Sequence, residues 1–406
     1  MAISFLLLII YLAFVSLGIP DGVLGVAWPE IRQTFDLPLA AAGYLSIIAA
    51  VGSITASFSS GHFIRKYGTG KIVTASAALT GLALLGFSLA PNFYIMAICF
   101  IPFGMGAGGV DAALNDYVSR HFSPRHMNWL HASWGIGAFV GPIIMTAAIV
   151  RLHSWRHGYM TVAAIQISLF FLFLFSMRLW KIHQSSVSDL PPQEKTVSQK
   201  EHVSFANKLK NGFHQVIARK GLFPAMLFYL CYTGSEIGLA LWCASYFREA
   251  RSVSKESAGL WVSCFFGCIT IGRILVGIIV NRVGTSRVIH MGQITSFIGF
   301  IFLLMPFATS VFCPVGISLI GLGFAPMYPC MMQDSPKHFG KDFSQSAIGY
   351  QMGMANVGAT FLPLFIGAVA GATTLWVIPV ITMIFFFGTV IAFRFVDRLP
   401  NLLEDK

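Results

Sequence analysis

The chain contains the stretch Gly61-His-Phe-Ile-Arg65-Lys66-Tyr67-Gly68-Thr69-Gly70-Lys71, which recurs 216 positions later as Gly277-Ile-Ile-Val-Asn281-Arg282-Val283-Gly284-Thr285-Ser286-Arg287. Each copy is a short basic segment between two long apolar segments. A repeat at half the chain length, in a sequence this hydrophobic, indicates two similar bundles of membrane helices. We therefore predict an all-α membrane protein with twelve transmembrane helices in two pseudo-symmetric six-helix bundles.

Composition excludes an ordinary soluble protein. Apolar residues make up 56% of the 406 residues and charged residues only 11%, against about 25% charged residues in a typical globular domain. Apolar runs long enough to cross a hydrocarbon core of about 30 Å as helices recur along the whole chain. Twelve are predicted, at residues 4–28, 39–60, 71–90, 92–119, 128–149, 158–179, 221–247, 257–280, 287–307, 309–332, 344–370 and 373–395.

A hydrophilic stretch divides these runs into six and six. We predict an N-terminal six-helix bundle over residues 1–180, a cytoplasmic linker over 181–220 and a C-terminal six-helix bundle over 221–406. Within the linker, apolar residues between Phe205 and Ile217 share one helical face, with Lys and Arg on or beside the opposite face. This pattern fits an interfacial helix on an anionic leaflet, and a plain connector helix is the alternative.

The net charge of +11 is a signal of membrane topology and not of a nucleic-acid partner. If the N-terminus is cytoplasmic, 20 of the 27 Lys and Arg lie at cytoplasmic ends of the predicted spans. Such a bias predicts that both termini are cytoplasmic. The first apolar run has no cationic segment before it and no cleavage site after it, so we interpret it as an uncleaved span. The predicted location is the plasma membrane, which in a bacterium is the inner membrane.

The sequence lacks the motifs of enzymatic chemistry. It has no Gly-rich loop ending in Gly-Lys-Ser/Thr, so ATP hydrolysis is not supported. All seven Cys lie in predicted spans and lack neighbouring polar residues in the sequence. This favours a role as small buried side chains over metal or redox sites. We expect no enzymatic activity, no cofactor and no metal.

Apart from Asp116, which lies close to the cytoplasmic end of its span, three acidic residues lie inside predicted spans, where an ionised side chain costs at least about 2.5–3.5 kcal/mol. Asp21 follows Pro20, in a stretch whose glycines loosen the helix and free backbone groups. Asp111 follows a glycine-rich stretch that permits close helix packing. Glu236 is the only acid within the spans of the second half. We predict that all three couple protons and bind the solute, with structural hydrogen bonding as the alternative.

Further polar and aromatic residues in the spans are candidates for solute binding. Aromatic rings stack on the apolar faces of pyranose rings, and acids and amides bond hydroxyl groups, so this combination suits a sugar. The candidates are Asn115, His131, Trp134, Tyr232, Trp242, Tyr328, Gln351 and Asn356. Lipid-facing or helix-packing roles are the alternatives. Trp242 points away from Tyr232 and Glu236 on an ideal helix, so its inclusion depends on a deformed seventh span or on the family resemblance described below.

Apart from residues at the ends of their spans, such as Lys71, Arg287 and Arg394, Arg273 is the only Lys or Arg inside a predicted span. It lies four residues before Gly277, near the cytoplasmic end of that span. We expect its side chain to snorkel or to contact the second hairpin, and an anion site is the alternative. A single cation argues against a polyanionic solute such as an organic phosphate.

Two six-helix halves, a central loop and a basic hairpin after the second span of each half resemble the major facilitator superfamily. The family's hairpin pattern is Gly, three residues, an acid or amide, a base, any residue and Gly. The second copy fits at Gly277, Asn281, Arg282 and Gly284. The first copy comprises Gly61, Arg65, Lys66 and Gly68, with Arg65 where the family usually carries Asp. The resemblance implies that these eight residues gate the cytoplasmic side, with the second copy doing more of the work.

Spans four and five resemble the fucose/proton symporter branch of that family. The resemblance rests on Gly104-Met-Gly-Ala-Gly-Gly-Val-Asp111-Ala-Ala-Leu-Asn115 and on His131-Ala-Ser-Trp134-Gly-Ile-Gly137. Span seven, with Tyr232-Thr-Gly-Ser-Glu236 and Trp242, is similar to sugar-transporting relatives in the same branch. In that branch an acid in span one and an acid in span four serve proton coupling and sugar binding. Asp21 and Asp111 stand at the matching places.

The resulting hypothesis is a secondary active transporter that works by alternating access. Its reaction is proton-coupled symport of a small neutral polar solute such as a sugar. Sodium-coupled sugar uptake, proton-antiport efflux of drugs or metabolites, and a receptor that binds without moving solute are the alternatives. The expected partners are a sugar-like small molecule, a coupling ion (a proton, or sodium) and the lipid bilayer. We expect a monomer and no nucleic acid.

Overall fold

The structure is a computed structural model that describes residues 2–122, 124–177, 179–180 and 219–400. All regular elements in these ranges are helices. Eleven helical segments are long and apolar enough to cross a membrane, and the apolar segment Ala41–Ser57 completes a set of twelve spans. Residues 181–218 lie outside the described ranges, so the linker and its interfacial helix remain predictions.

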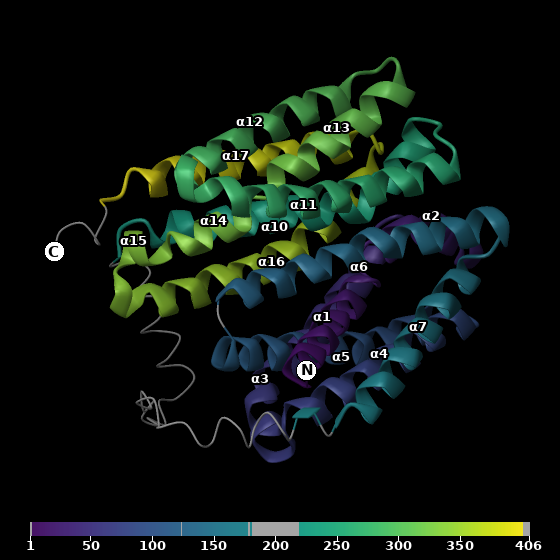
Figure 1. Cartoon of the computed structure of the whole chain (residues 1–406). Coiled ribbons are helices and arrows are strands. Elements are labelled where there is room, and N and C mark those ends of the chain that lie inside the picture. Colours follow the sequence, from purple (N-terminus) through teal and green to yellow (C-terminus); the bar gives the residue numbers. More distant parts are fainter. Residues whose placement is uncertain (1, 123, 178, 181–218, 401–406) are drawn as a thin grey trace, which may run out of the picture.

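The described helices fall into two halves that Figure 1 shows as a lower purple-to-teal layer and an upper green-to-yellow layer. The N-terminal half comprises α1 (Ala2–Gly18), α2 (Val23–Phe35), α3 (Ala41–Tyr67), α4 (Thr69–Leu89), α5 (Phe93–His121), α6 (Pro124–Arg151) and α7 (Trp155–Phe175). The C-terminal half comprises α10 (Leu222–Ser245), η1 (Tyr246–Ala250), α11 (Lys255–Val283), α12 (Thr285–Leu304), α13 (Thr309–Phe324), α14 (Met327–Gln333), α15 (Ser335–Phe339), α16 (Lys341–Ala372) and α17 (Val377–Asp397). The predicted fold class is confirmed.

The repeated hairpins have the same backbone conformation. Gly68 joins α3 to α4 with φ 84° and ψ 155°, and Gly284 joins α11 to α12 with φ 88° and ψ 147°. A residue with a Cβ is strained at such positive φ values, whereas glycine is not. The repeat found in the sequence is therefore a repeat of structure as well.

Two spans are interrupted near their middle, as their prolines predict. The first span stops at Gly18 and resumes at Val23, with Pro20 in the break. The tenth span divides into α13 and α14 on either side of Pro326. Breaks of this kind leave backbone groups without helical partners, which is tolerated only where the backbone is buried in protein or lines a cavity. The deformation of span seven that would bring Trp242 to Tyr232 and Glu236 is absent, because α10 continues from Leu222 to Ser245 without interruption.

Helices α1 and α6 approach so closely that glycine is required at their contact. A Cβ added to Gly137 would lie 2.1 Å from the Val15 carbonyl oxygen, and one added to Gly141 would lie 1.9 Å from the Ile19 carbonyl oxygen. Small residues four apart allow membrane helices to pack backbone against backbone. This contact fixes the broken first span against α6, and both segments carry residues of the candidate site.

Replacing Gly141 by Val should destabilise the fold by about 1–3 kcal/mol or more, because neither backbone can yield to the new side chain. The midpoint of thermal unfolding in detergent measures this loss. Gly353→Ala is the matched control, since a Cβ at this helical position in α16 meets nothing within 4 Å. It should leave the midpoint unchanged or raise it, because alanine favours a helix over glycine by about 0.5–1 kcal/mol. Equal midpoints for the two variants would contradict the α1–α6 contact.

The two halves touch at the end of the molecule remote from the chain termini, which we call the distal end. A Cβ added to Gly43 of α3 would lie 2.8 Å from Leu364 Cα of α16, and one added to Gly25 of α2 would lie 2.5 Å from the Ala240 carbonyl oxygen of α10. Gly349 and Gly353, earlier in α16, have open space where a Cβ would stand. The two halves are therefore closed against each other at the distal end.

Candidate functional site between the two halves

Asp21 lies in the break of the first span and is held by a residue of α6. The Trp134 indole N–H donates a hydrogen bond of 2.7 Å to Asp21 Oδ2. Asp21 is nevertheless classed among the exposed residues. The indole N–H of a tryptophan can only donate, so the Asp21 oxygen is the acceptor in this hydrogen bond.

Glu236 of α10 is buried and forms an ion pair with Arg273 of α11. The nearest nitrogen and oxygen atoms are 3.8 Å apart, and the side chain of Arg273 is 20% exposed and that of Glu236 7% exposed. The Arg273 guanidinium also lies over the Trp134 ring, 5.5 Å from its centre. A polar chain thus runs from Asp21 through Trp134 in one half to Arg273 and Glu236 in the other.

The position of Arg273 corrects the expectation that this side chain snorkels or contacts the second hairpin. Its neighbours are Glu236 and Trp134, and its charge also interacts with His131 and Tyr328. An arginine buried in a membrane protein is far more stable beside a carboxylate than alone. Glu236 and Arg273, the acid and the internal cation in the predicted spans of the second half, therefore form a pair. Opposite charges buried in one half of a membrane protein are expected to pair, and this was the sequence signal that could have identified the partner of Arg273.

Asp111 and Asn115 form the predicted polar strip on α5. The Asn115 amide donates a hydrogen bond of 2.9 Å to Asp111 Oδ1, and both residues are half-buried. Asp111 lies near enough to Asp21 and to Tyr328 for their charges to interact. It therefore belongs to the same polar region as Asp21.

Two tyrosines from the C-terminal half border this region. The Tyr232 hydroxyl donates to the Phe324 carbonyl oxygen over 3.2 Å and lies beside Glu236 and Arg273. Tyr328, after the break in span ten, is half-buried, and its ring centre lies 6.2 Å from that of Tyr232. The broken spans one and ten thus place Asp21 and Tyr328 in one region.

Among the remaining candidates, His131 and Asn356 are exposed, and the His131 ring packs edge-on against Phe14 at 5.6 Å. Two candidates lie elsewhere. Trp242 is fully buried and donates to the Pro363 carbonyl oxygen over 2.7 Å. Gln351 is fully buried and accepts from the Ser335 hydroxyl over 3.0 Å. Because α10 is not deformed, nothing turns Trp242 toward the polar region, and we leave both residues out of the proposed site.

A small cavity of about 50 Å³ adjoins Asp21 inside the N-terminal half. It is lined by Ser16, Pro20, Thr80 and Gln166, among others. Gln166 donates to the Ser16 carbonyl oxygen over 2.6 Å, while its own Oε1 is buried and bonds no described protein atom. A polar cavity of this size holds a few water molecules but no sugar ring, and it can supply water to one side of Asp21.

The residues of the gating prediction lie at the hairpins near the chain termini. Lys66, Asn281 and Arg282 are exposed, and a Cβ at Gly277 would meet nothing within 4 Å. The side chain of Arg65 is not described, and Gly61 lies on α3. One contact at the second hairpin was not predicted: Thr285 donates a hydrogen bond of 2.6 Å to the buried Asp334. The gating role remains a prediction.

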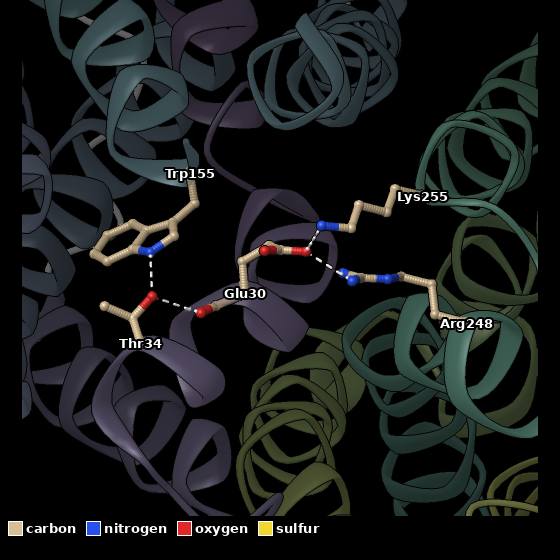
Figure 2. Close-up of polar contacts among 5 residues, drawn as sticks. All are labelled: Glu30, Thr34, Trp155, Arg248 and Lys255. Atoms are coloured by element: carbon tan, nitrogen blue, oxygen red, sulfur yellow. Dashed lines mark hydrogen bonds and ion pairs between the residues drawn. The ribbon is translucent and has the colours of Figure 1, made fainter. Parts of the chain in front are cut away.

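The closed distal end carries a set of charges that sequence reasoning missed. Glu30 of α2 accepts from Arg248 of η1 at 2.7 Å and from Lys255 of α11 at 2.8 Å. Figure 2 shows the Glu30 carboxylate between these two cations. A second ion pair joins Arg32 to Glu249 at 3.4 Å, here with the cation in the N-terminal half and the acid in the C-terminal half. We call these five residues the distal latch, because each of its ion pairs joins one half to the other.

The N-terminal side of the latch is braced within its own half. Thr34 donates to the Glu30 carbonyl oxygen over 2.8 Å, and the Trp155 indole N–H donates to the Thr34 hydroxyl over 3.0 Å (Figure 2). On the other side, Arg248 lies in a five-residue π-helical turn. Such turns re-aim side chains and are frequent at functional sites. Charges that lie far apart in the sequence are aligned here by tertiary structure alone.

Acidic and aromatic residues on interrupted helices, between two repeat-related bundles that meet at the distal end, define a secondary transporter. The chain belongs to the Major Facilitator Superfamily, whose sequence profile matches residues 10–249 and 226–405.

Individual relatives agree with this class. The glucose/mannose transporter GlcP of Bacillus subtilis is 23% identical over 331 residues, which cover 79% of this chain and 77% of that protein. The hexuronate transporter of the same organism is 23% identical over 271 residues, or 64% of this chain and 61% of that protein. Among solved structures, a D-xylose-proton symporter matches with a TM-score of 0.72 at 12% identity, over 99% of each chain. The chain is a transporter and not an enzyme.

Proposed function

We propose that this protein is a proton-coupled symporter for a hydroxylated solute of about the size of a sugar. The observation that carries the proposal is the chain from Asp21 through Trp134 and Arg273 to Glu236, which spans the interface between the halves. Carboxylates at such an interface can bind and release protons as water access changes sides. The names of relatives include a sugar transporter, a sugar-acid transporter and a sugar-proton symporter, which leaves the charge of the solute open.

The mechanism we propose is alternating access. Asp21 and Asp111 bind protons and accept hydrogen bonds from solute hydroxyl groups, and Asn115 provides a further amide. Trp134 and Tyr328 supply aromatic surface for an apolar sugar face. Opening of the distal end then requires the distal latch to separate while the hairpins close the other end. With both termini in the cytoplasm, as the distribution of Lys and Arg supports, the present conformation faces inward and the distal latch lies outside.

Reconstitution into liposomes tests this function. A pH-sensitive dye inside the vesicles should report acidification when the transported sugar or sugar acid is added outside. Sodium-dependent uptake of a labelled sugar without any pH change would replace the coupling ion. Alkalinisation of acid-loaded vesicles by amphipathic cations would replace symport by antiport efflux. No response of any kind, with binding retained, would favour a receptor.

A further inference from the structure

We infer that the solute carries one carboxylate, which binds Arg273 in exchange for Glu236. This inference rests on the proposed function and names the charge class of its substrate, a hydroxylated monocarboxylic acid. It replaces the neutral solute that the sequence predicted. Three observations carry it: the geometry of the ion pair, the free donors of Arg273 and the balance of charge.

The ion pair between Arg273 and Glu236 is loose. Its closest nitrogen–oxygen distance of 3.8 Å exceeds that of a charge-assisted hydrogen bond, about 2.7–2.9 Å. Arginine and a well-placed carboxylate form two parallel N–H···O hydrogen bonds. Arg273 and Glu236 do not form such a bidentate pair. Glu236 therefore neutralises Arg273 without occupying its hydrogen-bonding edge.

Donors of Arg273 are left over. A guanidinium has five N–H donors in a fixed fork, and the Arg273 Nε is buried without any partner among the described protein atoms. The plane of the group is placed by Trp134, whose ring centre lies 5.5 Å away. A buried donor without a partner is unfavourable, and a carboxylate is the ligand whose geometry matches a guanidinium fork.

The charge balance limits the ligand to one negative charge. Of the three acids in the polar region, Glu236 is paired with Arg273, and the charge of Asp21 interacts with both Asp111 and Glu236. A phosphate dianion or a dicarboxylate would meet three carboxylates with one cation to bind it. A monocarboxylate needs only that Glu236 release Arg273 and that the acids nearby hold protons.

Exchange of carboxylates on Arg273 also explains coupling. When the solute carboxylate takes the guanidinium, Glu236 loses its counter-charge in a region where an unpaired charge is costly. A proton from the same side of the membrane then neutralises it. Release of the solute returns Arg273 to Glu236 and expels the proton. Solute anion and proton thus move together, since each favours the binding of the other.

Paired probes of the same ring shape test this inference on the full-length protein in liposomes. D-Glucuronate is compared with D-glucose, and D-galacturonate with D-galactose, by acidification of the vesicle interior and by counterflow of labelled probe. The acid of at least one pair should be transported in preference to its neutral partner. Arg273→Gln should weaken its binding about 30-fold or more, because the ligand charge then lacks its partner. Arg287→Gln, an exposed position at the start of α12, is the control and should change nothing.

Two further variants keep the test decisive if Arg273→Gln does not fold. Arg273→Lys retains the charge but loses the fork, so acids should still be preferred, at reduced affinity. Glu236→Gln removes the competing carboxylate, so the apparent affinity for the acid should tighten about fivefold or more while coupled acidification is lost. A purely structural pair would give no such opposite effects.

Transport of the neutral sugar with unchanged affinity in Arg273→Lys would overturn the inference and leave proton–sugar symport standing. Weaker binding of the acid in Glu236→Gln would overturn the exchange on Arg273. A lack of proton-coupled transport for all four probes would overturn this inference together with sugar-size proton symport.

Discussion

Replacing Asp111 by Asn is expected to abolish proton-driven accumulation of the solute while leaving exchange across the membrane intact. An inward gradient of one pH unit supplies about 1.4 kcal/mol per coupled proton, enough for an accumulation ratio of about ten. In the variant this ratio should fall to about one. Asparagine keeps an acceptor oxygen for the 2.9 Å hydrogen bond from Asn115, so the helix contact survives and only the proton site is lost.

Accumulation and counterflow of the same labelled solute, measured in matched liposomes, separate coupling from binding. Asp36→Asn is the control, because Asp36 is exposed and has φ 51°, a conformation that asparagine tolerates well. It should accumulate solute like the unmodified protein. If Asp111→Asn accumulates solute to the same level, Asp111 has no part in coupling.

Replacing Glu30 by Gln should shift the protein toward a conformation that is open at the distal end. Glu30 is the one acceptor for both Arg248 and Lys255, and its pair with Arg248 is only 19% and 12% exposed. Exposed pairs contribute about 0–1 kcal/mol, but truncating one partner of a more buried pair costs more. We expect about 1–3 kcal/mol, which is a 5–150-fold change in the ratio of open to closed molecules.

Spin labels at residues 33 and 256, which are exposed on opposite sides of the latch, report the opening as a longer distance. Lys255→Gln is the matched control, because Lys255 is 51% exposed and its loss should produce a smaller shift. Exchanging the charges, with Glu30→Arg and Arg248→Glu together with Lys255→Gln, should restore closure, because Lys255 would otherwise repel the new cation at position 30. Identical distance distributions in Glu30→Gln, the exchanged pair and the unmodified protein would show that the latch does not hold the distal end.

The fold was largely predictable from the sequence because it rests on local chemistry. Runs of apolar residues define spans, since a bilayer requires every backbone group to bond within its helix. Pro20 marked the broken first span, and Gly68 and Gly284 marked equivalent turns. Asp111 and Asn115 were predicted to share a face because residues four apart on a helix are neighbours, and they do.

The candidate site was only partly predictable, because its key contacts join residues far apart in the chain. Trp134 and Asp21 were both candidates, but their hydrogen bond depends on how α6 packs against the broken first span. Arg273 was assigned to the membrane surface from its distance to Gly277, whereas its partner lies on another helix. Trp242 has the residue type of a sugar-binding tryptophan, yet a straight α10 buries it against α16.

The amino-acid sequence by itself indicated the membrane-spanning repeat, the interrupted first span and the acids inside the spans. Helix breaks and acidic side chains are unfavourable in a bilayer, so each of them points to a buried or functional position. Tertiary structure alone decided which end is closed, which cation meets which carboxylate and which aromatic side chains face the polar region. The distal latch shows the reason. Glu30 and Arg248 are ordinary charges at helix ends in the sequence, and only the packing of the two halves brings them to 2.7 Å.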